Sequence, residues 1–266
     1  MVTSVTLSSG VTLQYADRGR ASGMPLLFLH GATDSWRSFE PVLDRLPGTL
    51  RGLAITQRGH GHSSKPEDGY RCVNFSDDVV AFMDAVDLGA AVIVGHSMGS
   101  MVAQRLAVDH PARVAGLVLT GAFRTLYDHC GVREFWDSAL VTLRDPIDPA
   151  FARAFQVSTL HREIAPELLD VMVGESLQVP ARVWRALFSG FLETSDFSHE
   201  LRRLTAPALI VWGECDTYAP REDQEALHEL IAGSRLLTYS GIGHAVHWED
   251  PDRFVTDLVG FVCERR

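Results

Sequence analysis

The five residues Gly95-His96-Ser97-Met98-Gly99 form the part of the sequence best suited to covalent chemistry. They directly follow an apolar run and directly precede a stretch with helical spacing of its apolar residues. A tight strand-to-helix turn of this kind needs small flanking residues, and it holds the serine in strained backbone with its hydroxyl pointing outward. The start of the following helix favours negative charge that develops nearby. The pattern predicts that Ser97 is a nucleophile, and the alternative is a glycine-rich turn without chemistry.

A second turn, His30-Gly31-Ala32-Thr33, ends another short apolar run. A loop at that place can direct a backbone N–H at the oxyanion that forms when a serine attacks a carbonyl group. We predict that the N–H groups of Ala32 and Met98 form this oxyanion hole. Because the donor is the backbone, the imidazole of His30 is expected to be packed and hydrogen-bonded.

A nucleophilic serine needs a base and an acid that orients the base. Asp216 follows an apolar run, and His244 follows the strand-like residues Arg235–Tyr239. The carboxyl ends of parallel strands meet at one edge of a sheet, so both side chains are expected near the serine. Glu214 and His247 are the nearest rivals. Glu214 would lie closer to its strand end, and the Gly-x-Gly-His turn favours His244 as the base.

Short unbroken apolar runs recur along the chain and alternate with helical patterns. Strands that are buried on both faces give such runs, as in a parallel sheet covered by helices. An antiparallel hairpin with its turn at Ser8-Ser9-Gly10 is expected before them. The later strands are expected at Pro25–Leu29, Leu53–Ile55, Ala90–Val94, Leu117–Leu119, Ala208–Trp212 and Arg235–Tyr239. Helices are expected over Ser76–Leu88, over Met98–His110, after Pro220 and from Asp250-Pro251 onward.

Residues 122–199 break this alternation, because they contain amphipathic helical pieces separated by prolines and no strand-like run. We expect an all-helical cap at 122–199, inserted into a core formed by 1–121 and 200–266. Long insertions of this kind shape substrate sites. Most of the cap's aromatic side chains are expected to pack in its own interior, and a few to meet the substrate. The candidate substrate contacts are His30, Trp36, Phe123, Trp136, Trp184, Phe188 and His247.

The composition argues against several classes of protein. With 46% hydrophobic and 22% charged residues, the 266-residue chain has the proportions of an ordinary soluble globular protein. A net charge of −10 does not suit nucleic acid or an anionic membrane. No apolar run approaches the ~18 residues of a membrane-spanning helix, and the start of the chain lacks the features of a signal peptide.

The sequence also contains no strong pattern for a metal site or for disulfide bonds. The four cysteines lie far apart, which favours reduced thiols in a cytoplasmic protein over disulfides or a zinc site. His60 and His62 form an H-x-H pattern without a third ligand in sequence, so a loop without metal is expected. We therefore expect no metal and no cofactor, and the oligomeric state stays open.

The motifs together resemble those of the α/β-hydrolase superfamily. The resemblance is carried by HG at 30–31, RGHGHS at 58–63, GHSMG at 95–99, WGECD at 212–216 and GIGHAVHWEDP at 241–251. It implies a mostly parallel sheet of about eight strands, with a helical cap after the sixth and a Ser97–His244–Asp216 triad. Gln57 and Ser100 depart from the residues that relatives often carry at these positions, without touching the inferred triad.

The resemblance implies a serine hydrolase that cleaves a small carboxylic ester or lactone through an acyl-enzyme. Relatives that act on alkyl carbon need a carboxylate nucleophile, so a haloalkane dehalogenase or an epoxide hydrolase is disfavoured. A C–C bond hydrolase of aromatic breakdown would use the same triad and is the alternative enzyme. A ligand-binding relative with low turnover is the alternative outside enzymes. The aromatic residues of the cap favour an apolar or aromatic small molecule as the substrate.

Overall fold

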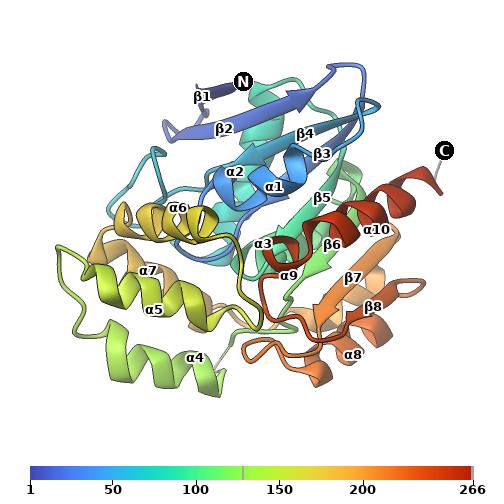
Figure 1. Cartoon of the computed structure of the whole chain (residues 1–266). Coiled ribbons are helices and arrows are strands. Elements are labelled where there is room, and N and C mark those ends of the chain that lie inside the picture. Colours follow the sequence, from blue (N-terminus) through green and yellow to red (C-terminus); the bar gives the residue numbers. More distant parts are fainter. Residues whose placement is uncertain (128, 265–266) are drawn as a thin grey trace.

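The computed structural model describes residues 1–127 and 129–264. Asp128 in the predicted cap and residues 265–266 at the end of the predicted core lie outside the described residues. Within the described part, one sheet of eight strands has the order β1-β2-β4-β3-β5-β6-β7-β8 (Figure 1). The strands are β1 (Val2–Thr6), β2 (Thr12–Gly19), β3 (Met24–Leu29), β4 (Leu50–Ile55), β5 (Ala91–His96), β6 (Val114–Thr120), β7 (Ala208–Gly213) and β8 (Arg235–Tyr239).

The strand directions confirm the predicted α/β-hydrolase fold class. β1 and β2 form an antiparallel hairpin, and β2 is also antiparallel to β4. From β4 to β8 every pair of neighbours is parallel. The carboxyl ends of the central strands therefore lie along one edge of the sheet, where the loops that carry the candidate site begin.

The continuous apolar runs reflect burial on both faces of this sheet. In β3, Leu27 and Leu29 belong to the cluster that contains buried residues of α2 (Cys72–Ala85) and α3 (Met98–Asp109). Leu26 and Phe28 belong instead to the cluster with α10 (Pro251–Cys263). Successive side chains of a strand point to opposite faces, so a strand covered on both sides requires an apolar residue at every position.

The remaining helices include those between β6 and β7. Figure 1 shows α4, α5, α6 and α7 gathered as a group on one side of the sheet. Between Thr120 and Ala208, the described residues form helical turns and loops without a strand. The boundaries 122–199 of a separate cap stay a prediction. The helices between β6 and β7 are α4 (Cys130–Phe135), α5 (Pro149–Ser158), α6 (Pro166–Leu177) and α7 (Ala181–Leu192). Elsewhere in the described chain lie α1 (Glu40–Leu43), α8 (Arg221–Leu230) and α9 (Val246–Glu249). Shorter helical turns are found at Trp36–Phe39, Pro111–Arg113, Trp136–Leu140 and Ser198–Arg203.

Local capping explains where two of the late helices begin. The side chain of Asp250 accepts a hydrogen bond from the backbone N–H of Arg253, with Pro251 at the first helical position of α10. Pro220 precedes α8, whose first turn carries Glu222 and Asp223. A search of the described residues finds no helix long and apolar enough to cross a membrane.

Candidate functional site

Ser97 is the single residue between the end of β5 and the start of α3, and it has φ 53° and ψ −117°. This backbone conformation is strained for any residue with a side chain. The two flanking glycines are required by close packing. A Cβ atom added to Gly95 would lie 2.3 Å from the carbonyl oxygen of Gly99, and one added to Gly99 would lie 2.1 Å from that of Leu29. The elbow therefore forms because β3, β5 and α3 meet with no room for a methyl group at either glycine.

The structure brings Asp216 and His244 together. Nδ1 of His244 lies 2.8 Å from Oδ2 of Asp216. The other oxygen, Oδ1, accepts hydrogen bonds from the backbone N–H groups of Tyr218 and Ala219, at 2.8 and 2.9 Å. The Asp216 side chain is fully buried, and that of His244 is 4% exposed. A carboxylate can only accept, so Nδ1 of His244 carries the proton and Nε2 is the nitrogen left to act as a base.

The end of β6 links this pair to the serine. The backbone N–H of Ser97 donates to the carbonyl oxygen of Thr120 at 3.0 Å. A Cβ atom on the next residue, Gly121, would lie 2.9 Å from Nδ1 and from Cε1 of His244. The backbone N–H of His244 also donates to Thr159 O, just after α5, at 2.9 Å. Ser97 and the imidazole of His244 thus contact the consecutive residues Thr120 and Gly121, which places them side by side.

A cavity of about 180 Å³ adjoins the elbow and is walled mainly by apolar side chains. Both predicted oxyanion donors, Ala32 and Met98, line it. The rings of Phe123 and Tyr218, which also line it, lie 6.0 and 5.2 Å from the His244 ring. The lining residues are Ala32, Met98, Phe123, Leu126, His129, Gly131, Val132, Phe135, Phe155, Leu187, Phe188, Phe191, Thr217 and Tyr218.

The predicted substrate contacts divide into two groups. Phe123 and Phe188 line the cavity. His30, Trp36, Trp136, Trp184 and His247 are not among its lining residues.

The two histidines of the second group hold other parts of the core. Nε2 of the fully buried His30 accepts from the backbone N–H of Gln57 at 2.9 Å. Burial and the neighbouring His60 hold the pKa of His30 well below its usual range. His247 is also fully buried, stacks on Phe39 at 4.5 Å and has Nε2 3.0 Å from Ser38 Oγ.

The three tryptophans of the second group are packing residues. Trp184 is fully buried against the rings of Phe151 and Phe155. Trp36 is 6% exposed, and Trp136 is half-buried against the main core. None of these five side chains lines the cavity, so none of them is proposed as a substrate contact.

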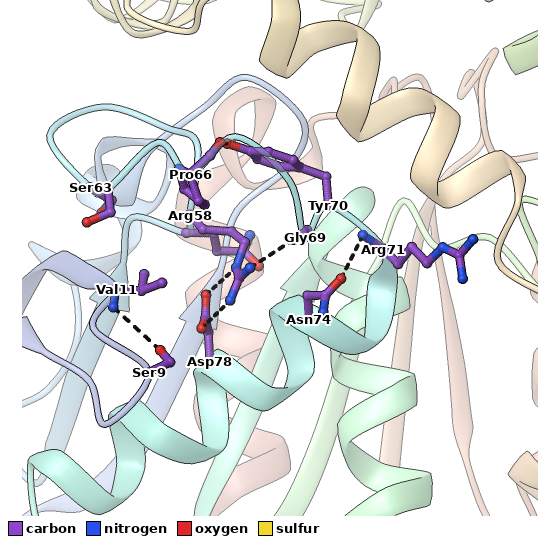
Figure 2. A network of polar contacts seen from close by, with 12 residues as sticks. Ser9, Val11, Arg58, Ser63, Pro66, Gly69, Tyr70, Arg71, Asn74 and Asp78 are labelled. Atoms are coloured by element: carbon purple, nitrogen blue, oxygen red, sulfur yellow. Dashed lines mark hydrogen bonds and ion pairs between the residues drawn. The ribbon is translucent and has the colours of Figure 1, made fainter.

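The RGHGHS motif fixes the loop between β4 and α2. Nε and Nη2 of Arg58 each donate to one carboxylate oxygen of Asp78 on α2, both at 2.6 Å, and Nη1 donates to Gly69 O at 2.9 Å (Figure 2). His60 is buried, with Nδ1 2.8 Å from Arg58 O, whereas His62 is exposed. Throughout the described part of the chain, no three His, Cys, Asp or Glu side chains converge as metal ligands.

Sequence reasoning missed several residues at the site. Thr217 and Tyr218 immediately follow Asp216 and line the cavity, a position that the loop motif could have indicated. His129, Phe135 and Phe155 reach the cavity only through the packing of the helices after β6, for which the sequence has no local signal.

Comparisons with known proteins identify the family of this chain. The family model described as "alpha/beta hydrolase fold" matches residues 24–251. A non-heme chloroperoxidase from Streptomyces lividans is 30% identical over 275 aligned positions, which cover 97% of this chain and 99% of that protein. A 2-hydroxymuconate semialdehyde hydrolase from Pseudomonas sp. strain CF600 is 25% identical and is covered to 93%, with 97% of this chain aligned.

The solved structures include an esterase from Rhodococcus sp. ECU1013. It is 28% identical and superimposes with a TM-score of 0.86, covering 100% of this chain and 99% of the esterase. Sequence and structure agree over nearly the full length of the chain, which belongs to the α/β-hydrolase family.

Proposed function

We propose that this hydrolase cleaves a small carboxylic ester or lactone through an acyl-enzyme formed on Ser97. The observation that carries the proposal is the buried contact between His244 Nδ1 and Asp216 Oδ2, at 2.8 Å, beside a strained serine. This contact leaves Nε2 of His244 free to take the serine proton. A strand-to-helix turn without chemistry has no need of such a pair.

The proposed reaction has two halves. Ser97 Oγ attacks the acyl carbon while Nε2 of His244 takes its proton, and the carbonyl oxygen becomes an oxyanion that the N–H groups of Ala32 and Met98 stabilise. The tetrahedral intermediate collapses, and the imidazolium gives its proton to the leaving alkoxide. A water molecule then attacks the acyl-enzyme with the same imidazole as its base, and the carboxylic acid is released with Ser97 restored.

The apolar cavity supports a substrate with an uncharged aromatic or aliphatic group. The rings of Phe135 and Phe155 stack with centroids 5.7 Å apart, and the ring of Phe188 stands across that of Phe135 at 5.5 Å. All three rings line the cavity. Burial of an apolar group here gains roughly 25 cal/mol for each Å² removed from water.

The test is hydrolysis of p-nitrophenyl esters from acetate to decanoate, and of an enol lactone, by the wild type and by Ser97→Ala. The matched control is Ser8→Ala, which removes an exposed hydroxyl from the β1–β2 turn. We expect Ser97→Ala to lower kcat by a factor of roughly 10³ or more and Ser8→Ala to retain full activity. A fluorophosphonate probe should add covalently to the wild type and to Ser8→Ala alone, with the modified peptide containing Ser97.

Equal activity of the wild type and Ser97→Ala would overturn the proposal. Turnover of a vinylogous 1,5-diketone without turnover of any ester or lactone would assign C–C bond hydrolysis to the same residues. Failure of the wild type with all substrates and with the probe would favour a ligand-binding role.

A further inference from the structure

A buried carboxyl that takes no part in the proposed reaction lies where the helices after β6 meet the sheet. Asp34 is 2% exposed. Its Oδ1 accepts from Nε2 of Gln156 on α5 at 3.0 Å, and its Oδ2 accepts from Oγ of Ser38 at 3.3 Å. Among the residues that the structure describes, no lysine, arginine or histidine forms an ion pair with Asp34. Burial raises the pKa of Asp34 to about 7.

The neighbouring residue, Thr33, is attached to the same helices. Its Oγ1 lies 3.0 Å from Oγ of Ser176 on α6, and that hydroxyl accepts from Nε2 of Gln156 at 2.8 Å. Thr33 is fully buried and has φ +66°. A β-branched residue in this region is strained, and such a conformation persists only where the surrounding contacts hold it.

These two residues directly follow Ala32, the proposed oxyanion donor. The carboxyl also reaches the residue before it, because a Cβ atom on Gly31 would lie 3.2 Å from Asp34 Oδ2 and 2.9 Å from His96 Nδ1. The backbone N–H of Asp34 donates to Gly31 O at 3.4 Å, which closes the turn. The turn over residues 31–34 is therefore held by its own hydrogen bond from Asp34 to Gly31 and by side-chain contacts with Gln156 on α5 and Ser176 on α6.

We propose that Asp34 is a positioning residue, which with Gln156 fixes the 31–34 turn so that the Ala32 N–H is in place for the oxyanion only when α5 and α6 are docked. This inference rests on the proposed function of Ser97 and Ala32. Docking of α5, whose Phe155 lines the substrate cavity, thereby becomes coupled to completion of the oxyanion hole. A displacement of about 1 Å in such a donor can cost a factor of 10² in rate.

The kinetic test compares Asp34→Ala, Gln156→Ala and their double variant with Asp34→Asn, which keeps an oxygen for Gln156. We expect Asp34→Ala and Gln156→Ala to lower kcat roughly 10- to 100-fold with KM changed less than about 3-fold. The double variant should be no slower than the slower single variant, because both changes release the same turn. Asp34→Asn should restore most of kcat.

The matched control is Arg182→Gln. Arg182 on α7 donates to Pro66 O and Lys65 O at 2.8 and 2.7 Å, so it joins the inserted helices to the sheet side without touching the 31–34 turn. Its loss should lower the melting temperature without lowering kcat. Inhibition by phenylboronic acid adds a readout of the oxyanion hole, because its adduct on the serine is a tetrahedral anion with one boronate oxygen in the place of the oxyanion. The inhibition constant should rise with the loss of kcat in Asp34→Ala and stay constant in Arg182→Gln.

Hydrogen–deuterium exchange of the peptide that covers residues 28–36 separates this inference from the proposed function. Faster exchange in Asp34→Ala and Gln156→Ala, but not in Arg182→Gln, is expected whether or not esters are the substrate. An inactive wild type with this exchange pattern would reject the proposed function and leave the positioning role standing. Unchanged exchange, or unchanged kcat and boronate inhibition with a lower melting temperature, would overturn the positioning role.

Discussion

Oδ2 of Asp216 lies 2.8 Å from Nδ1 of His244, while Oδ1 of the same carboxyl accepts two backbone N–H groups from its own loop. The loop therefore holds the carboxyl through the oxygen that does not contact the imidazole. One oxygen serves the local fold and the other orients the imidazole, so the two roles can be separated by substitution.

Asp216→Asn is the substitution that separates them. The asparagine keeps an oxygen for the N–H groups of Tyr218 and Ala219, but its amide nitrogen offers a donor to His244 and stabilises the wrong tautomer. We expect kcat to fall by a factor of about 10⁴ with a nearly unchanged melting temperature. Glu214→Gln, which changes the exposed rival carboxylate, is the control and should keep wild-type kcat. If Glu214→Gln were slow and Asp216→Asn fully active, Glu214 and not Asp216 would be the acid that orients His244.

Gly99→Ala tests the packing that creates the elbow. The added methyl group would lie 2.1 Å from Leu29 O, so β3 and α3 must separate, and we expect a loss of several kcal/mol or no folded protein. Gly260→Ala, in an exposed turn of α10 with no atom within 4 Å of the new methyl group, is the matched change. It should stabilise the protein by about 0.5–1 kcal/mol. Urea unfolding gives both values, and equal effects would contradict the packing account.

The Arg58–Asp78 pair predicts a large and non-additive effect on stability. Both carboxylate oxygens are bound, and the two side chains are 10% and 5% exposed. Arg58→Met leaves a buried carboxyl without its cation and should cost about 3–5 kcal/mol of unfolding free energy. The double variant Arg58→Met/Asp78→Leu should be more stable than Arg58→Met. Arg221→Met, which breaks the exposed Arg221–Glu225 pair on α8, should cause little change. Additive losses in the double variant would contradict this prediction.

Four buried imidazoles make the fold sensitive to acid. Burial holds the pKa of His30 and that of His96 well below the usual value of 6.5, and lowers the pKa to about 4 for His60 and about 3 for His247. The unfolded chain therefore binds more protons than the folded chain below pH 6.5. The stabilisation is complete above that pH and is lost as the pH falls toward the folded pKa values.

Asp34 acts in the opposite direction, since its raised pKa means that the folded chain keeps a proton that the unfolded chain has lost between about pH 4 and 7. These five groups together predict a net uptake of protons on unfolding at pH 5, so the free energy of unfolding should rise as the pH is raised from 5 toward 7. Urea unfolding between pH 5 and 7 measures the slope of this rise. His247→Gln should reduce it by about 1.4 kcal/mol per pH unit. An unchanged slope would show that His247 is charged in the folded protein.

The sequence predicts best those elements whose signals are local. The strand expected at Arg235–Tyr239 has these bounds in the structure, and the helices after Pro220 and Asp250 begin where their caps indicate. The helix expected over Ser76–Leu88 instead runs from Cys72 to Ala85. At its start the backbone N–H of Arg71 donates to the side chain of Asn74, and arginine is not a residue that normally marks a helix start.

The candidate site divides in the same way. Ser97, Asp216 and His244 each follow a strand and are marked by glycine-containing turns, so the sequence alone places them at one edge of the sheet. The contact between Asp34 and Gln156 joins residues 122 positions apart, and neither belongs to a motif. The cavity walls likewise depend on the angles at which α4 to α7 pack. Such contacts arise from tertiary packing, and no local pattern specifies them.

β6 and β7 are direct neighbours, paired from Leu117 with Ala208 to Thr120 with Val211, although the inserted helices separate them along the chain. The insertion thus leaves from and returns to adjacent positions, and the entropy of closing a loop rises by only about 0.6 kcal/mol for each doubling of its length. Descendants of this chain can lengthen, shorten or exchange the insertion at little cost to the sheet. Selectivity can then diverge within this one segment, as long as a new insertion still supplies the contacts that Gln156 makes with Asp34 and that Thr159 makes with the backbone of His244.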